Sequence, residues 1–178
     1  MIGEQKTQRS ITLGTYKKIV SVLDKNMNVL DYGAGFCHGT KYLNEIGFNA
    51  ESFEIYPQKN INPDYLRFED INKQYDFIIC NCVINVISNI EDRKQVLFNI
   101  YKLLKINGKA IILTRPIIEI EKVKNKVIEN DGYRLSNGSF QKGYSQQELI
   151  NFVENNLKNI NIENTNIGKI SLILQKIS

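Results

Sequence analysis

The sequence predicts an α/β fold in which a mostly parallel sheet is covered by helices on both faces. Two observations support this prediction. Strand-like apolar runs alternate with helix-like segments from about residue 11 to residue 115, which is typical of parallel strands joined by crossover helices. The chain then ends in two β-rich runs, 159–166 and 169–177, that are close enough in sequence to pair as a C-terminal antiparallel hairpin.

The elements up to residue 115 follow from periodicity and from turn residues. Apolar residues at close to helical spacing predict a first helix over about 11–23. A second helix is expected to run to Ile46 and to stop at Gly47, and a third, with one apolar face, is expected over 91–105. Five strands are expected between and after these helices, at 29–33, 49–57, 64–68 (the weakest), 75–83 and 109–115.

The pattern changes after Pro116. A helix is expected around 118–129, and the following residues, 130–144, are rich in glycine and in aromatic side chains. Ser145 and Glu148 have the spacing of a capping box, which predicts the start of a further helix. Together with the hairpin, these elements give an expected sheet of seven strands.

Length and composition favour one domain over residues 1–178, with a loose N-terminus at 1–10. The chain has 178 residues, of which 42% are hydrophobic and 24% charged, and this suits a single globular core. No signal peptide, membrane span or disulfide framework is recognisable, so we expect a cytoplasmic protein without a membrane partner. Cys80 and Cys82 alternate in face and lack a second CxxC pair, so no metal site is expected.

A glycine turn follows the first expected strand. In an open parallel sheet, ligands bind outside the carboxyl ends of the strands, and glycines there let a ligand approach the backbone. Gly33 and Gly35 lie where this strand passes into a helix, whose free N–H groups favour an anion. A dinucleotide would require a small residue where His38 stands, since the next glycine, Gly39, comes one residue late. A chain of this length also has no room for a separate substrate domain.

The segment Asp31-x-Gly33-x-Gly35 resembles the first motif of class I S-adenosylmethionine-dependent methyltransferases, which have a Rossmann-like fold. The resemblance implies that Gly33, Ala34 and Gly35 hold the methionine part of S-adenosyl-L-methionine and that Asp31 lies near its amino group. Cys37 stands where that family usually has a third glycine. A tight strand-to-helix turn without a ligand is the alternative interpretation of the same residues.

Two further acids strengthen the cofactor hypothesis. Glu54 ends the second expected strand, 23 residues after Asp31, and an acid placed there can accept hydrogen bonds from ribose hydroxyls. Asp70 follows the third expected strand, where the resemblance places an acid against the adenine amino group. Ile55 and Ile71 follow these acids and complete the expected cofactor site on this side.

The exit of the fourth expected strand supplies candidates for catalysis. Asn81 and Asn85 lie there, and we expect Asn81 to contact the cofactor and both to orient a methyl acceptor. Neither a D/N/S-P-P-Y/W motif nor a Pro-Cys pair is present, so Cys82 is assigned to core packing. Residues 131–144 are expected to form a substrate lid, with Tyr144 as a third candidate catalytic residue. An ordinary loop with packed aromatic residues is the alternative.

Two longer segments, NCVINVISNIEDR and GSFQKGYSQQELINFVE, are similar to methyltransferases associated with DNA phosphorothioation gene clusters. This resemblance implies a fold and a cofactor but no substrate. The sequence thus predicts methyl transfer from S-adenosyl-L-methionine to a small-molecule or nucleic-acid acceptor, with the oligomeric state open. The formal net charge of +4 permits a nucleic-acid partner without requiring one.

Two alternatives remain. One is a non-catalytic S-adenosylmethionine-binding subunit of a DNA-modification or defence complex. The other is an enzyme that consumes S-adenosylmethionine without an acceptor.

Overall fold

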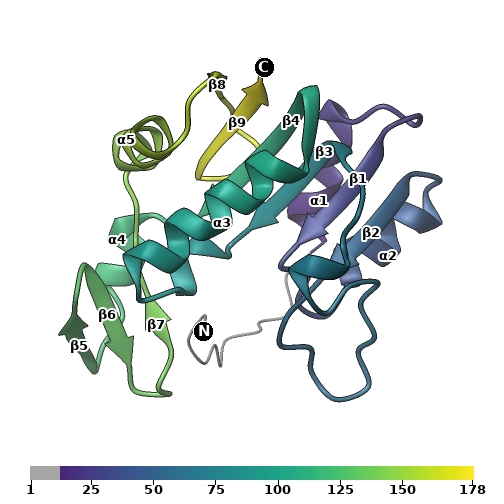
Figure 1. Cartoon of the computed structure of the whole chain (residues 1–178). Coiled ribbons are helices and arrows are strands. Elements are labelled where there is room, and N and C mark those ends of the chain that lie inside the picture. Colours follow the sequence, from purple (N-terminus) through teal and green to yellow (C-terminus); the bar gives the residue numbers. More distant parts are fainter. Residues whose placement is uncertain (1–12) are drawn as a thin grey trace.

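The computed structural model describes residues 13–178, so the expected loose segment 1–10 and the start of the first expected helix lie outside the described residues. The central sheet has the strand order β2-β1-β3-β4-β9-β8 (Figure 1). The first four of these strands are parallel, β9 is antiparallel to β4, and β8 and β9 form the expected hairpin. The strands are β1 (Asn28–Tyr32), β2 (Asn49–Phe53), β3 (Tyr75–Asn81), β4 (Leu104–Thr114), β8 (Ile160–Asn164) and β9 (Ile170–Lys176).

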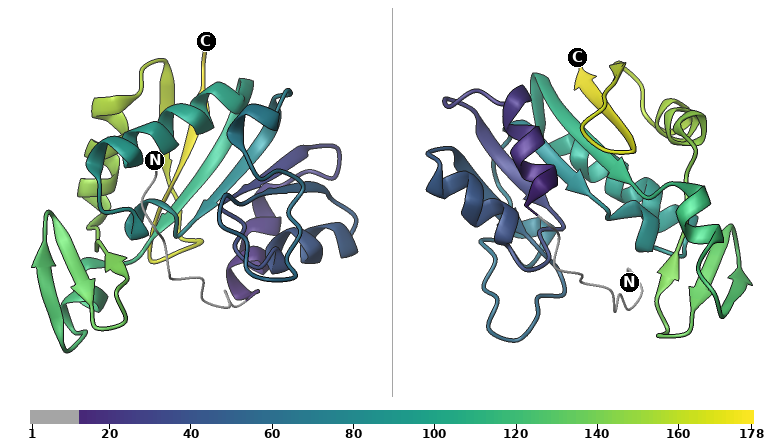
Figure 2. Two further views of the ribbon diagram at one scale, coloured as in Figure 1. Left: turned by 60° about the horizontal axis from the view of Figure 1, so that its bottom comes forward. Right: turned by 180° about the vertical axis from the view of Figure 1, so that it is seen from behind.

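Helices cover both faces of this sheet, as the two views of Figure 2 show. The helices α3 and α5 pack on one face through residues such as Leu97 and Val153, and α1 and α2 pack on the other through Ile19 and Leu43. The five α-helices are α1 (Gly14–Ile19), α2 (His38–Glu45), α3 (Ile90–Leu103), α4 (Ile117–Glu121) and α5 (Gln146–Asn156). Short 3₁₀ turns lie at Val20–Val22, Phe68–Asp70 and Ile84–Val86.

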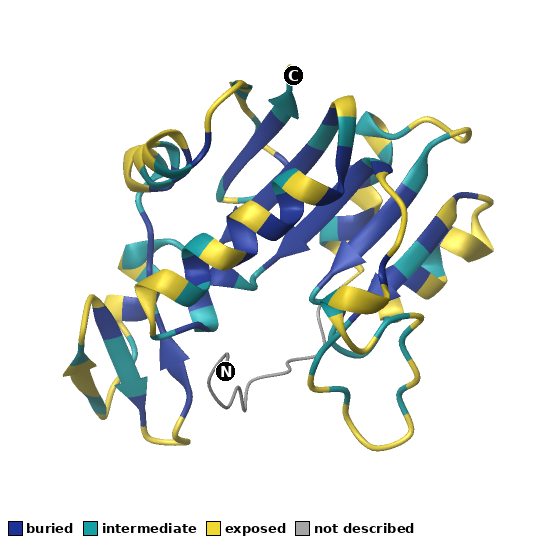
Figure 3. Cartoon of the chain, viewed as in Figure 1, coloured by how far each residue is buried: buried dark blue, intermediate teal, exposed yellow. Residues whose placement is uncertain are grey.

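The central strands are buried on both faces, which explains their continuous apolar sequences (Figure 3). In β3, Ile78 belongs to the core under α3 and α5, whereas Ile79 belongs to the core under α1 and α2. The α/β fold with its mostly parallel sheet and C-terminal antiparallel hairpin is therefore confirmed. The capping box is confirmed as well, because Ser145 and Glu148 exchange side-chain-to-backbone hydrogen bonds at the start of α5.

The expected strand at 64–68 is wrong, and the central sheet has six strands rather than seven. Only an isolated bridge joins Tyr65 to Phe53. The reason is a side-chain contact with β2: the carboxylate of Asp64 accepts hydrogen bonds from the backbone N–H and the hydroxyl of Ser52, at 2.8 and 2.7 Å. A side chain thus occupies the edge of β2 where a strand backbone would have paired.

The expected helix at 118–129 is also wrong beyond its first turns. Helix α4 ends at Glu121, and the chain then forms a small antiparallel sheet of β5 (Lys126–Glu129), β6 (Gly132–Leu135) and β7 (Phe140–Gln141). Asn125 and Asn130 have φ angles of 53° and 52°, and such left-handed residues end a helix and turn a hairpin. Residues 131–144, expected as a substrate lid, thus include the strands β6 and β7.

This small sheet lies beyond the carboxyl ends of β3 and β4, beside the start of α3 (Figure 1). It is joined to the exit of β4 by main-chain hydrogen bonds. The N–H of Tyr144 donates to the carbonyl of Arg115, and the N–H of Ile117 donates to the carbonyl of Tyr144. Residues 141–144 are thereby held against the exit of β4.

Among residues 13–178, no helix combines the length and the apolar character that crossing a bilayer would require.

Candidate functional site

A cavity of about 940 Å³ lies at the carboxyl ends of the parallel strands. Its walls come from the exits of β1, β2, β3 and β4, from the loop before the 3₁₀ turn at Phe68–Asp70, from one face of α3 and from β7. Two parts of the cavity are distinguished by the residues that form them. The β2 end is formed by Gly33, Gly35 and Glu54. The β4 end is formed by Asn85, Arg115 and Gln141.

The glycine turn shapes the β2 end. Gly33 and Gly35 have φ angles of 76° and 58°, in the left-handed region that favours glycine. A Cβ atom on Gly33 would lie 2.5 Å from Cγ2 of Val83, whereas a Cβ on Gly35 would meet nothing within 4 Å. Gly33 thus permits close packing against the exit of β3, and Gly35 faces open space. A ligand can approach the backbone at Gly35.

Glu54 is held by the glycine turn itself. Its Oε2 accepts a hydrogen bond from the N–H of Gly35 at 2.9 Å, and its Oε1 accepts from the N–H of Tyr56 at 2.9 Å. Each carboxylate oxygen can accept more than one hydrogen bond, so Glu54 retains capacity for ligand hydroxyls. The carboxylate therefore lines the cavity in a fixed orientation. Ile55, also expected here, lines the cavity beside it.

Asp31 lies behind the turn and does not line the cavity. It is 1% exposed, and its carboxylate accepts hydrogen bonds from the hydroxyls of Tyr16, at 2.8 and 2.9 Å, and of Thr40, at 2.9 Å. Burial raises the pKa of Asp31 to about 6, against the lowering effect of these two hydrogen bonds. Asp31 thus ties α1 and α2 to the end of β1.

Gly39 explains the displaced glycine of the motif. A Cβ atom there would lie 2.0 Å from the ring of Tyr16, so glycine is required for the Tyr16 side chain to reach Asp31. Sequence reasoning used Gly39 only to exclude a dinucleotide and missed Tyr16 and Thr40. The sequence signal for the contact between Tyr16 and Asp31 was Gly39 at the start of α2, combined with a tyrosine in the first helix.

Besides Asp31, three expected cofactor residues do not line the cavity. The carboxylate of Asp70 forms an ion pair with Arg67 at 2.8 Å on the surface, and this pairing lowers the pKa of Asp70. Ile71 and Ala34 are buried in the fold. In their place, the preceding residues Arg67, Phe68 and Glu69 line the cavity.

The structure places two of the three expected catalytic residues at the cavity. Asn81 and Asn85 both line the cavity, and both are more than nine-tenths buried. Tyr144 does not line it: this residue is 1% exposed, and its hydroxyl accepts a hydrogen bond from Nη1 of Arg93 at 3.2 Å. From the segment expected as a lid, Gln141 reaches the cavity instead.

Asn85 and Gln141 form a buried amide pair at the β4 end. Nδ2 of Asn85 donates to Oε1 of Gln141 at 3.2 Å, and the main-chain N–H of Lys142 donates to the carbonyl of Asn85 at 2.7 Å. Oδ1 of Asn85 is buried and has no hydrogen-bond partner within the described part of the chain. Sequence reasoning missed Gln141 and Arg115. The position of Arg115 at the end of a predicted strand was the only signal for either.

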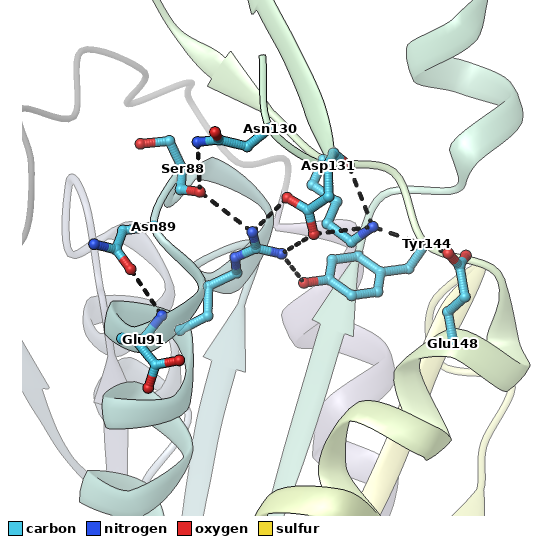
Figure 4. Close-up of polar contacts among 9 residues, drawn as sticks. Ser88, Asn89, Glu91, Asn130, Asp131, Tyr144 and Glu148 are labelled. Carbon is cyan, nitrogen blue, oxygen red and sulfur yellow. Dashed lines mark hydrogen bonds and ion pairs between the residues drawn. The ribbon is translucent and has the colours of Figure 1, made fainter. Parts of the chain in front are cut away.

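An ion pair fastens the small sheet to α3. The guanidinium of Arg93, which is 1% exposed, donates to both carboxylate oxygens of Asp131, at 2.9 and 2.5 Å. Figure 4 shows Asp131 and Tyr144 on one side of this guanidinium and Ser88 on the other, and the carbonyl of Ser88 also accepts from it at 3.3 Å. Partial burial opposes the ionisation of Asp131, but the contact with Arg93 outweighs it and lowers the pKa of this carboxyl. The ion pair fixes the sheet that carries Gln141.

Within residues 13–178, no group of three or more histidine, cysteine or acidic side chains is arranged to hold a metal ion.

The comparisons with known proteins agree on one family. Residues 7–156 match a family model described as a methyltransferase domain. No curated protein matches the chain.

Solved structures resemble the chain along most of its length. An S-adenosylmethionine-dependent methyltransferase from Clostridium acetobutylicum is 13% identical and has a TM-score of 0.70, over 94% of this chain and 93% of that chain. The sugar N-methyltransferase KedS8 from a Streptoalloteichus species is 10% identical with a TM-score of 0.68, over 100% and 99% of the two chains. The 1,6-didemethyltoxoflavin-N1-methyltransferase from Burkholderia thailandensis, with 1,6-didemethyltoxoflavin and S-adenosylhomocysteine bound, is 14% identical with a TM-score of 0.67, over 92% and 77%. At these identities the likeness concerns the fold.

Proposed function

The chain belongs to the methyltransferase-domain family and is an S-adenosylmethionine-dependent methyltransferase, and we propose that it methylates a small molecule bound at the β4 end of the cavity. One observation carries this proposal: a single cavity joins the β2 end, with its open glycine backbone and oriented Glu54, to a β4 end lined by amides and a guanidinium. The first end suits the cofactor and the second suits an acceptor.

The residues of the β2 end fit S-adenosylmethionine. We assign ribose binding to Glu54, whose carboxylate is oriented by two backbone N–H groups. The open backbone at Gly35 suits the methionine part, and Asp31 supports this turn from behind through Tyr16 and Thr40. On the adenine side we assign the contact to Ile55 and Phe68, which line the cavity, whereas Asp70 is paired with Arg67 outside it. When bound, the cofactor supplies an activated methyl group on a sulfonium.

The protein's own task is alignment and the exclusion of water. Asn81 ends β3 between the two ends of the cavity, where it is placed to contact both ligands. The apolar walls at Val83, Val86 and Ile87 exclude water from the space between the ends. Holding the acceptor in line with the methyl group supplies most of the rate enhancement such a site needs.

A small-molecule acceptor is favoured over a polynucleotide for two reasons. The formal net charge of +4 comes from Lys and Arg residues spread over the whole chain, rather than gathered in one segment. The Burkholderia enzyme, of the same fold, has a small molecule and S-adenosylhomocysteine bound. The link to DNA phosphorothioation clusters, and with it a nucleic-acid acceptor, stays a prediction from two sequence segments. Membership of the family favours catalysis over a non-catalytic binding role.

Calorimetry with S-adenosylhomocysteine tests the cofactor site. We expect Glu54→Gln to weaken binding by about 10-fold to 100-fold, because a hydrogen-bonding carboxylate contributes on the order of 1.5–3 kcal/mol. Glu45→Gln, at the exposed end of α2, is the matched control and should bind as the wild type does. Absence of heat with the wild type, or equal affinity in the Glu54 variant, contradicts this assignment.

Incubation with methyl-labelled S-adenosylmethionine tests the reaction. A small-molecule extract of the source cells and their genomic DNA are offered separately. Label recovered in an extracted compound supports the proposal, and label in DNA at a steeply salt-dependent rate supports a polynucleotide acceptor instead. Breakdown of the cofactor without a labelled product indicates consumption without an acceptor, and intact cofactor throughout indicates a binding role alone.

A further inference from the structure

The β4 end contains a buried hydrogen-bond acceptor that the described part of the chain leaves without a partner. Asn85 is 1% exposed and lines the cavity, and its Oδ1 has no hydrogen-bond partner there. Buried polar atoms of this kind are rare, because desolvation is costly when no bond replaces the lost water. The side chain is also held in place, since its Nδ2 donates to Gln141. Oδ1 is therefore available to an N–H donor on a ligand.

The same end has a cation whose charge is only partly balanced. Arg115 lines the cavity, and its side chain is 24% exposed. Its acidic neighbour, Glu119, lies 3.6 Å from the guanidinium and is shared with Lys169, which makes a closer contact with the same carboxylate. Two cations thus share one carboxylate. The remaining positive charge at Arg115 favours an anionic group on the ligand.

The wall between these two groups is mostly apolar. Cys82, Val83 and Val86 line the cavity along the exit of β3. In the strand order β2-β1-β3-β4, Arg115 lies three strand spacings from Glu54, which amounts to about 14 Å. That distance leaves room for a second molecule beside a nucleoside held at Glu54.

We propose that the methyl acceptor is an anionic small molecule with an N–H group, which donates to Oδ1 of Asn85 while its carboxylate or other anionic group pairs with Arg115. The inference rests on the proposed function, because it places this molecule beside a bound cofactor. The apolar body of the molecule packs on Val83 and Val86. Asn85 and Arg115 determine specificity by recognising two different groups on one ligand.

Binding to protein saturated with S-adenosylhomocysteine tests the inference. The probes are the ortho, meta and para isomers of aminobenzoate, which carry an amine, a carboxylate and an apolar ring. Benzoate and aniline each lack one of the two polar groups. We expect at least one isomer to bind about 10-fold or more tightly than either partial probe, because each has lost one hydrogen-bonded or ionic contact.

Variants then identify the two contacts. Asn85→Leu should weaken the preferred isomer by about 5-fold to 10-fold and leave benzoate binding unchanged. Arg115→Gln should weaken the isomer by about 10-fold to 100-fold and leave aniline binding unchanged. Lys102→Gln removes another cation of the cavity wall and should leave the isomer's affinity as it is.

Affinity for S-adenosylhomocysteine distinguishes a failure of the proposed function from a failure of the inference about the acceptor. If the wild type does not bind S-adenosylhomocysteine, the proposed function fails. If it does bind, and no isomer binds more tightly than benzoate and aniline, the inference about the acceptor is overturned while the function stands. The inference is also overturned if the preferred isomer binds equally to wild type and to both variants. Unchanged S-adenosylhomocysteine affinity in each variant shows that the variant is folded.

Discussion

Removal of Asp131 should destabilise the protein by much more than removal of an ordinary surface carboxylate. In Asp131→Ala, the buried guanidinium of Arg93 keeps two acceptors among residues 13–178, the hydroxyl of Tyr144 at 3.2 Å and the carbonyl of Ser88 at 3.3 Å. Breaking a buried ion pair by removing one partner costs about 3–5 kcal/mol. Asp131 is itself 41% exposed, so water admitted by the truncation hydrates part of the charge. We therefore expect a loss of about 2–3 kcal/mol in the free energy of unfolding.

Equilibrium unfolding in urea measures this loss, with Glu129→Ala as the matched control. Glu129 also forms an ion pair within the small sheet, but it and its partner Arg134 are about one-third exposed, and such pairs contribute about 1 kcal/mol or less. Arg93→Met combined with Asp131→Ala removes both partners of the pair, and Lys142, which lies 3.5 Å from Asp131, keeps Glu148 at 3.9 Å. The double variant should therefore be more stable than Asp131→Ala alone. The reasoning is refuted if Asp131→Ala costs no more than Glu129→Ala, or if the double variant is less stable than the single one.

Two further predictions concern the region behind the glycine turn. Gly39→Ala should destabilise the fold by about 2–3 kcal/mol, because its Cβ would lie 2.0 Å from the Tyr16 ring. Gly35→Ala should cost only about 1 kcal/mol of backbone strain, because its Cβ would meet no atom within 4 Å. Thermal or urea unfolding compares the two, and equal losses would contradict the steric account. For Asp31, burial raises the folded-state pKa from 3.8 to about 6, so the stability it contributes is fully present below about pH 4 and is lost as the pH rises through 6. The stability of the wild type relative to Asp31→Asn should thus fall by about 3 kcal/mol between about pH 4 and pH 7, and a flat difference over this range would show that the pKa of Asp31 is not raised.

The features that sequence predicted well depend on short stretches of chain. The parallel strands could be predicted because burial on both faces requires apolar residues at successive positions, as in Ile78 and Ile79. Glu54 was expected at the cavity, which it lines, for a similar reason: a polar residue directly after such a strand lies at the sheet edge where ligands bind. Gly33 and Gly35 were predicted because a strand-to-helix turn needs positive φ angles.

The features that sequence missed depend on contacts between distant segments. Asp64 replaces an expected strand by bonding to Ser52 on β2, and no local pattern shows which carboxylate will meet a free strand edge. Residues 126–129, part of an expected helix, form a strand because β6 pairs with them, and β6 is paired on its other side with β7. Tyr144 was expected at the cavity as an aromatic residue of a lid. It is buried because Arg93, 51 residues earlier, supplies a partner for its hydroxyl.

The two ends of the cavity are built from different kinds of structure, and this separation bears on how such a protein can change its acceptor. The β2 end consists of strand exits whose positions are fixed by the central sheet, since Gly33 and Ala34 donate to the carbonyl of Phe53. The β4 end includes Gln141, which reaches the cavity because main-chain hydrogen bonds hold residues 141–144 near Asn85 and Arg115 and because the ion pair of Arg93 fastens the small sheet. Substitutions within that small sheet can therefore reshape the acceptor's surroundings while the residues assigned to the cofactor stay in place. Such changes affect the three-stranded small sheet and its ion pairs, which lie outside the two cores that hold the parallel strands together.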